Sequence, residues 1–177
     1  LIVDGVYLAY KYMSEGKKVF LEGAQGTMLD IDHGTYPFVT SSNPTSGGAC
    51  SGAGIPPTQI NKVIGVAKAY VTRVGEGAFP TELKGKKGEY LREKGHEFGA
   101  TTGRPRRCGW FDGMVLKHAT MISGLTDVAL TKLDVLSGMD ELKLCTGYTV
   151  DGQEIEHVPP SGWELKKVKP VYESYAG

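Results

Sequence analysis

The sequence predicts an α/β fold, mainly a parallel sheet with flanking helices, with an antiparallel hairpin near the C-terminal end. Apolar residues at helical spacing alternate along the chain with short runs of β-forming residues, which is typical of this class. Near the end, Asp151-Gly152 separates two strand-like patterns at 142–150 and 153–157, as in a two-residue hairpin turn. The 177 residues suit one domain.

In the first half, residues 2–15 carry an apolar stripe that predicts a helix ending at Gly16. The run Val19–Leu21 predicts a short buried strand. Residues 44–57, rich in Gly, Pro and Ser, predict a loop. A further apolar stripe then predicts a helix over 59–71, with Thr58 as its N-cap.

In the second half, Asp112 and Gly124 mark the start and stop of a predicted helix over 112–123. The apolar run 128–130 predicts a second buried strand. The remaining segments are expected to be a loop or short strand at 72–83, a solvated charged stretch at 84–94, a loop at 96–109, and a tail at 158–177 without a terminal element.

Composition excludes several classes of protein. Twenty basic and twenty acidic residues give a net charge of zero, so no global field favours nucleic acid or an anionic membrane. No apolar run approaches the roughly 18 residues of a membrane span, and the first residues lack secretory signal features. Three cysteines without a CxxC pair argue against a disulfide framework or zinc site and favour a cytoplasmic location.

Residues 22–43 form the first chemistry-bearing stretch, at the carboxyl end of the predicted strand 19–21. Small residues on both sides of Gln25 let the backbone approach a ligand, and the Gln25 amide both donates and accepts, which suits a nucleobase edge. A polar surface loop is the alternative. Asp30, Asp32 and His33 could be metal ligands, but their spacing favours structural hydrogen bonding within the loop.

The second stretch places Arg104, Arg106 and Arg107 behind Gly99–Gly103. Guanidinium groups bind carboxylate and phosphate in bidentate fashion, and a glycine-flanked Thr-Thr pair suits an anion. A solvated basic turn is the alternative; a nucleic-acid patch is disfavoured by the zero net charge.

The third stretch, Thr131–Asp134, follows the predicted strand at 128–130. A carboxylate there can accept from both the ring N–H and the exocyclic amine of guanine, a donor pair that adenine lacks. The stem of Lys132 can pack over a base plane. Taken alone, the four residues fit a structural strand end better than a guanine site.

Together these stretches resemble a known family. GAQGTMLDIDHGTYPFVTSSN (23–43), FGATTGRPRRCGW (98–110) and LTKLDVL (130–136) are similar, in this order, to signatures of adenylosuccinate synthetase. The resemblance implies a P-loop NTPase-like fold, of which residues 1–177 would be a single, incomplete central domain. The phosphate loop, the catalytic acid and base, and a C-terminal segment would then lie outside this chain.

The resemblance also implies the reaction. Family members phosphorylate the 6-oxygen of IMP with GTP, and the amino group of L-aspartate displaces that phosphate, giving adenylosuccinate, GDP and phosphate in the first committed step of AMP synthesis. It implies Mg²⁺, held in the missing N-terminal segment, and a cytoplasmic homodimer whose partner lends an arginine to IMP. This chain alone would be inactive. The alternatives are a non-catalytic guanine-nucleotide-binding module and a purely structural α/β fragment.

Individual roles follow from the same resemblance. Gln25 would contact the IMP base and its developing oxyanion, Thr40 the 5′-phosphate, and Val74-Gly75 the ribose, although residue types alone equally suit a turn there. Asp134 would select guanine. The remaining assignments are aspartate contacts at Ala100, Thr101, Thr102, Gly103, Arg104, Pro105 and Arg106, an IMP ribose contact at Arg104, and GTP contacts at Arg106, Lys132 and Leu133. Pro105 stands where many members have arginine, which could alter the mobility of the loop.

Overall fold

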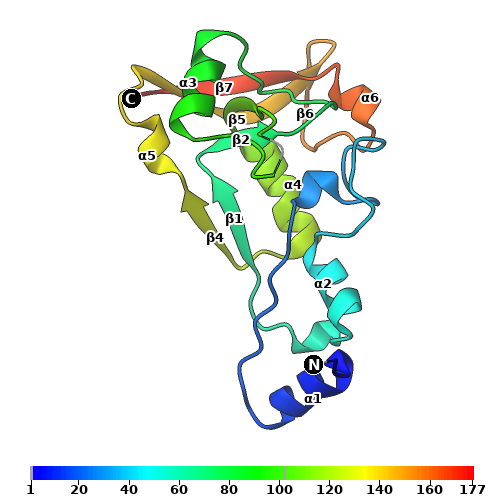
Figure 1. The fold of residues 1–177 in the computed structure, drawn as a ribbon. Helices are drawn as coiled ribbons and strands as arrows, with labels where there is room; N and C mark the ends of the chain where they lie inside the picture. Colours follow the sequence, from blue (N-terminus) through cyan, green and yellow to red (C-terminus); the bar gives the residue numbers. More distant parts are fainter. Residues whose placement is uncertain (1, 102) are drawn as a thin grey trace.

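The computed structural model describes residues 2–101 and 103–177. A two-stranded parallel ribbon in the middle of the molecule leads into a larger mixed sheet, and the N-terminal helix lies at the opposite end (Figure 1). Within the described part of the chain, no helix has the length and apolar character needed to span a bilayer.

The N-terminal helix α1 (Gly5–Ser14) confirms the first predicted element. The Asp4 side chain caps it by accepting from the Tyr7 N–H at 3.0 Å, and Gly16 follows with φ +71°. The strand predicted at Val19–Leu21 is wrong. This segment pairs with no described strand, and Phe20 is 83% exposed. β-Propensity does not make a strand without a hydrogen-bonded neighbour.

Residues 44–57, predicted as a loop, contain helix α2 (Ser46–Ala53). Thr45 is the N-cap and accepts from the Gly48 N–H at 3.4 Å, and Gly54 ends the helix in the left-handed conformation. Capping at both ends outweighs the low helix propensity of the three glycines inside it. The 3₁₀ turns η1 (Thr27–Leu29) and η2 (Pro57–Gln59) flank this region.

The helix predicted over 59–71 is wrong. Strands β1 (Ile64–Lys68) and β2 (Tyr70–Arg73) occupy most of it. β1 pairs in parallel with β4 (Asp127–Thr131), from Ile64 opposite Asp127 to Lys68 opposite Thr131. Pairing with β4, which is distant in the sequence, makes residues 64–68 a strand. The spacing of apolar residues within 59–71 carries no information about that partner. β4 confirms the strand expected at 128–130, but its residues are all exposed, not buried.

The mixed sheet has the order β2-β3-β5-β6, with β7 also paired to β5. Its further strands are β3 (Arg107–Asp112), β5 (Glu141–Val150), β6 (Gln153–Ile155) and β7 (Lys169–Ala176). β3 and β5 are parallel, and the other pairings in this sheet are antiparallel. The α/β class is confirmed, as is the hairpin, whose turn residues Asp151 and Gly152 have φ +52° and +83°.

The tail is more ordered than expected, because it forms helix α6 (Gly162–Leu165) and the edge strand β7, which pairs with β5 along its whole length. The charged stretch 84–94 also differs from its prediction: it forms helix α3 (Lys86–Lys94), with Leu91 fully buried. β7 depends on backbone pairing with the distant strand β5, and α3 depends on packing of Leu91 against the cluster around Tyr70, so neither cause is visible in the local sequence.

Helix α4 (Gly113–Ser123) is confirmed, with Asp112 as its N-cap. Asp112 and Tyr148 are buried together, and the Tyr148 hydroxyl donates to Asp112 Oδ2 at 2.6 Å. Tyr148 belongs to the larger core cluster, together with Met114, Cys145 and Leu165. A second cluster around Tyr70 and Leu91 lies beneath α3 and the short helix α5 (Leu133–Leu136).

Candidate functional site

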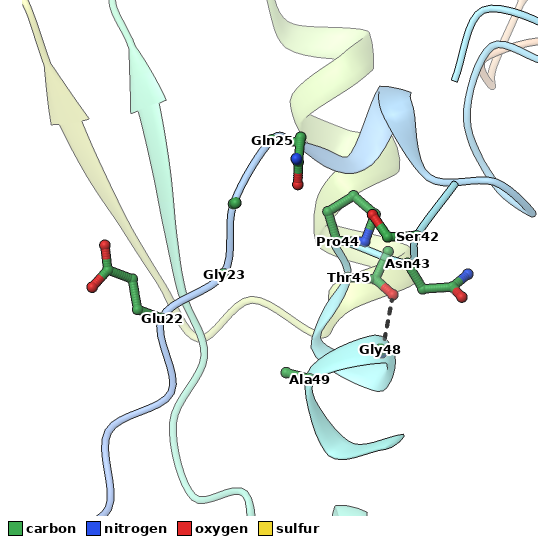
Figure 2. Close-up of a pocket in the computed structure, with 10 residues that line it drawn as sticks. Glu22, Gly23, Gln25, Ser42, Asn43, Pro44, Thr45, Gly48 and Ala49 are labelled. Atoms are coloured by element: carbon green, nitrogen blue, oxygen red, sulfur yellow. Dashed lines mark hydrogen bonds between the residues drawn. The ribbon is translucent and has the colours of Figure 1, made fainter. Parts of the chain in front are cut away.

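Gln25 lies at a cavity of about 200 Å³ between the segment 22–25 and the start of α2. Figure 2 shows its side chain pointing into this space, whereas Glu22 points away from it. Gln25 has φ +61°, a left-handed conformation that is costly for a residue with a side chain. Strain of this kind is typical of functional sites and supports the choice of Gln25 as a ligand contact.

The opposite wall of the cavity comes from the end of the first motif, at Ser42 and Asn43, and from residues of the segment 44–57 that was predicted as a plain loop. The latter are Pro44, Thr45, Gly48 and Ala49. The available signal was Thr45 as an N-cap and Gly54 as a stop, on either side of a run of small residues. A Cβ at Gly48 would overlap the Asn43 carbonyl oxygen, so the close contact between α2 and the turn before it requires glycine.

Asp30 is the hydrogen-bonding centre of the loop behind Gln25. Its Oδ1 accepts from the N–H groups of Asp32 at 2.9 Å and His33 at 3.0 Å, and from Asn43 Nδ2 at 3.2 Å. Asn43 Nδ2 also donates to Asp32 Oδ2 at 2.7 Å. These contacts confirm structural hydrogen bonding by Asp30 and Asp32. Across residues 2–101 and 103–177, no three His, Cys, Asp or Glu side chains gather as metal ligands.

Thr40, Val74 and Gly75 do not line the cavity beside Gln25. The Thr40 hydroxyl accepts from Ser42 Oγ, which does line it, at 3.4 Å. Val74 is 50% exposed, and Gly75 lies on a second cavity of about 320 Å³ with Arg107 and Lys166.

Two arginines hold this region together. Arg73 donates to Phe38 O at 2.9 Å and to Glu76 O at 2.8 Å, which joins the loop before Thr40 to the turn after Val74. Arg107 donates to the carbonyls of Gly75 and Gly77 at 3.1 and 3.0 Å. Arg107 is itself paired with Glu82 at 2.6 Å. The hydrogen bond to Glu82 raises the pKa of Arg107 and lowers that of Glu82.

The predicted aspartate contacts lie on a hairpin-like loop between α3 and β3. Arg106 N–H donates to Glu97 O and Gly99 N–H donates to Arg104 O, each at 2.9 Å, and between these bonds Phe98 faces Pro105. The described residues of the tip, Ala100, Thr101, Gly103, Arg104 and Pro105, are exposed. Thr102 lies outside the described residues.

Pro105 occupies the non-hydrogen-bonded position of this bridge, since the two backbone bonds flank it. Its missing N–H therefore removes no hydrogen bond from the loop.

Glu97 lies beneath the loop and is 1% exposed. Its carboxylate accepts from Tyr70 Oη at 2.5 Å, from Lys68 Nζ at 3.0 and 3.1 Å, and from Arg106 Nη1 at 2.7 Å. Burial alone would raise the pKa of Glu97, but the hydrogen bonds from Tyr70, Lys68 and Arg106 outweigh it and lower that pKa. Nothing in the local sequence marks Glu97, because two of its partners come from the junction of β1 and β2.

The predicted guanine contacts lie where β4 ends and α5 begins. Lys132 has φ +62°, and its ammonium donates to Gly95 O at 2.9 Å. It therefore joins this segment to the base of the loop that carries Arg104 and Arg106. Leu133 is 57% exposed and Asp134 is also exposed, so both are open to a ligand.

The structure thus forms two groups of predicted site residues. Lys68, the last residue of β1, and Lys132, directly after β4, hold the Arg104–Arg106 loop at the carboxyl edge of the parallel ribbon. Gln25 belongs to a separate cavity, beside the ribbon and in front of α4 (Figure 2).

Comparison with known proteins gives one consistent result. A family model described as adenylosuccinate synthetase matches residues 1–177. The adenylosuccinate synthetase of Bifidobacterium adolescentis is 61% identical over 167 residues, covering 94% of this chain and 39% of the relative. That of Moorella thermoacetica is 59% identical over 177 residues, covering all of this chain and 42% of the relative.

A solved structure gives the same family. A fully ligated adenylosuccinate synthetase from Plasmodium falciparum superposes with a TM-score of 0.96 at 48% identity, covering 99% of this chain and 42% of that one. The chain spans about two fifths of the length of the curated relatives it matches. The resemblance seen in the three motifs is confirmed, and the chain belongs to the adenylosuccinate synthetase family.

Proposed function

We propose that this chain supplies recognition elements of a GTP-dependent ligase that joins IMP to L-aspartate, giving adenylosuccinate, GDP and phosphate. The observation that carries the proposal is the family match over all 177 residues, which includes the three motif loops. The separation of those loops into a Gln25 cavity and an arginine loop braced by lysines also supports it.

In this proposal Gln25 holds the IMP base. Its amide N–H₂ can donate to the 6-oxygen as negative charge develops there, which is electrostatic stabilisation of the kind that oxyanion holes provide. Thr40 faces the 5′-phosphate, and Val74 and Gly75 face the ribose. The hydrogen bonds from Arg73 to Phe38 O and from Arg107 to Gly75 O would hold the segments around Thr40, Val74 and Gly75 in place before substrate arrives.

The loop that carries Arg104 binds the carboxylates of L-aspartate through Thr101, Thr102 and Arg104, with Ala100 beside them. The Arg104 guanidinium can form paired hydrogen bonds with a carboxylate, and this contact orients the amino group toward the base. Gly103, Pro105 and Arg106 complete the loop. Orientation of the nucleophile is the contribution of this loop to the rate.

At the guanine end, Asp134 accepts from the base, Leu133 contacts it, and the stem of Lys132 covers it. Arg106 faces the GTP phosphates. The proposal includes Mg²⁺, a cytoplasmic location and a homodimer. The described residues offer no ligand set that fits Mg²⁺, so none of the roles above depends on the ion.

A chimaera tests the proposal. The chain replaces the matching 177-residue segment of the Moorella thermoacetica relative, and adenylosuccinate is measured with IMP, GTP and L-aspartate and with each substrate omitted. We expect product only with all three substrates, and none from the 177-residue chain alone. A folded chimaera that binds GTP but forms no adenylosuccinate, beside an active parent, would favour the non-catalytic module.

A further inference from the structure

Glu97 is a buried carboxylate that none of the predicted contacts includes, and it lies where three structural elements meet. Tyr70 and Lys68 reach it from the junction of β1 and β2, and Arg106 reaches it from the start of β3. The carboxylate is charged and compensated by two cations, leaving the cluster a net charge of +1. A cluster of this sign, at the base of a loop that binds anions, attracts the ligand instead of repelling it.

Glu97 fixes Arg106 at two points. The backbone carbonyl of Glu97 accepts from the Arg106 N–H at 2.9 Å, and the side chain accepts from Arg106 Nη1 at 2.7 Å. Arg92 Nε also donates to Arg106 O at 2.9 Å. The Arg106 side chain keeps 33% of its surface exposed. Glu97 therefore holds the guanidinium at Nη1, and the other N–H donors form an open edge that can bind an anion.

Lys68 completes the arrangement. Its ammonium contacts both Glu97 oxygens and also Thr72 Oγ1 at 2.5 Å, so Glu97 is held by a cation that is itself fixed to β2. Burial lowers the pKa of Lys68, and the hydrogen bond to Glu97 opposes that change. The carboxylate therefore has little freedom to turn, and Arg106 takes its orientation from a rigid acceptor.

We propose that Glu97 is a positioning residue that aims the open edge of the Arg106 guanidinium at the anionic groups of the substrates. The inference rests on the proposed function, which assigns Arg106 to L-aspartate and GTP. Without the Glu97 charge, the Arg106 side chain samples many orientations. An anion must then order that side chain when it binds, which lowers the affinity for the anion. IMP, whose predicted contacts other than Arg104 lie away from this loop at Gln25, Thr40, Val74 and Gly75, is unaffected.

A double-mutant cycle in the chimaera tests this proposal, with Glu97→Gln, Arg106→Gln and the two together. Glutamine matches the shape of glutamate but turns an amide donor toward a cation. We expect Glu97→Gln to raise the KM for L-aspartate about tenfold or more, with the KM for IMP unchanged. If Glu97 acts through Arg106, the double variant behaves like Arg106→Gln alone.

Effects of the two changes that multiply, or an equal rise in the KM for IMP, would overturn the proposal, because either result means a general structural role. Glu141→Gln is the matched control: it removes one charge from the exposed Lys87 pair, on β5, and should leave every KM unchanged. If Glu97→Gln does not fold, the double variant Glu97→Gln, Lys68→Met is used instead. It also removes the Lys68 ammonium that would lose its carboxylate partner, so the effect on Arg106 can still be measured.

A measurement on the 177-residue chain separates this inference from the proposed function. In NMR spectra, a guanidinium held at Nη1 gives separate N–H signals because rotation about its bonds is slowed. We expect such signals for Arg106 and their loss in Glu97→Gln. An inactive chimaera would refute the proposed function, whereas unchanged Arg106 signals would refute the positioning by Glu97.

Discussion

Replacing Tyr148 by phenylalanine removes a single hydroxyl from the core of the mixed sheet. Tyr148 is fully buried, and its hydroxyl donates at 2.6 Å to Asp112, which is 3% exposed. Asp112 also caps α4 through the Val115 N–H at 3.2 Å. The change therefore removes one hydrogen bond to the carboxylate that caps α4 and leaves the aromatic ring in the core.

The structure sets the magnitude. No cavity forms, since the ring stays, so the cost is that of one hydrogen bond to a buried charged group, about 1.5–3 kcal/mol. For a chain of this length, a loss of 2 kcal/mol lowers the Tm by roughly 4–8 °C.

The loss depends on pH. Burial raises the pKa of Asp112, and the hydrogen bond from Tyr148 opposes this rise. A carboxyl group with a raised folded-state pKa favours folding below its unfolded pKa of about 3.9 and loses that contribution as the pH rises through the folded value. Without Tyr148 the pKa of Asp112 rises further. The destabilisation by Tyr148→Phe is therefore largest at neutral pH and shrinks toward about pH 4.

Urea denaturation of the 177-residue chain at several pH values measures this difference in unfolding free energy. Tyr172→Phe is the control: it is the same change beside the same core cluster, and no hydrogen bond from its hydroxyl is found among the described residues. We expect the control to stay within about 0.5 kcal/mol of the parent. A Tyr148→Phe loss equal to that of the control, or constant with pH, would refute the reasoning.

Three further predictions concern the loops. Arg104→Leu in the chimaera should raise the KM for L-aspartate and lower kcat, with a cost of about 2–5 kcal/mol for the lost charge-assisted pair; unchanged aspartate kinetics would remove Arg104 from the site. Asp134→Asn should weaken use of GTP and improve use of XTP, because an amide can donate to the xanthine carbonyl; steady-state kinetics with both nucleotides decide, and an unchanged preference for GTP makes Asp134 a structural residue. Gly48→Ala should destabilise the chain by about 1–3 kcal/mol, because the added methyl group overlaps Asn43. Gly52→Ala in the same helix meets no atom within 4 Å and should stabilise the chain by roughly 0.5–1 kcal/mol. Urea midpoints that shift in the same direction for both variants would contradict this prediction.

Elements whose signals are local were predicted correctly from the sequence. The apolar stripe and Gly16 predict α1, Asp112 and Gly124 predict α4, and Asp151-Gly152 predicts the hairpin. In each case a cap or turn residue satisfies backbone groups within a few positions, so the chain nearby contains the whole cause.

Elements that depend on distant partners were not predicted correctly from the sequence. β1 needs β4, and β7 needs β5, so the spacing of apolar residues in 59–71 and the punctuated tail pointed elsewhere. The candidate site divides in the same way. Gln25 and the arginine loop are visible as motifs, whereas Glu97 gains its role only from Lys68 and Tyr70, which the fold brings to it.

Pro105 has a consequence for the entropy of the chain. A proline restricts its own φ and the residue before it, so the unfolded ensemble has fewer conformations to lose when the loop forms. Because residue 105 needs no N–H in the bridge between Glu97 and Arg106, this restriction is gained without breaking a backbone bond. The loop that carries Arg104 and Arg106 therefore loses less conformational entropy when it folds than it would with a freely rotating residue at position 105.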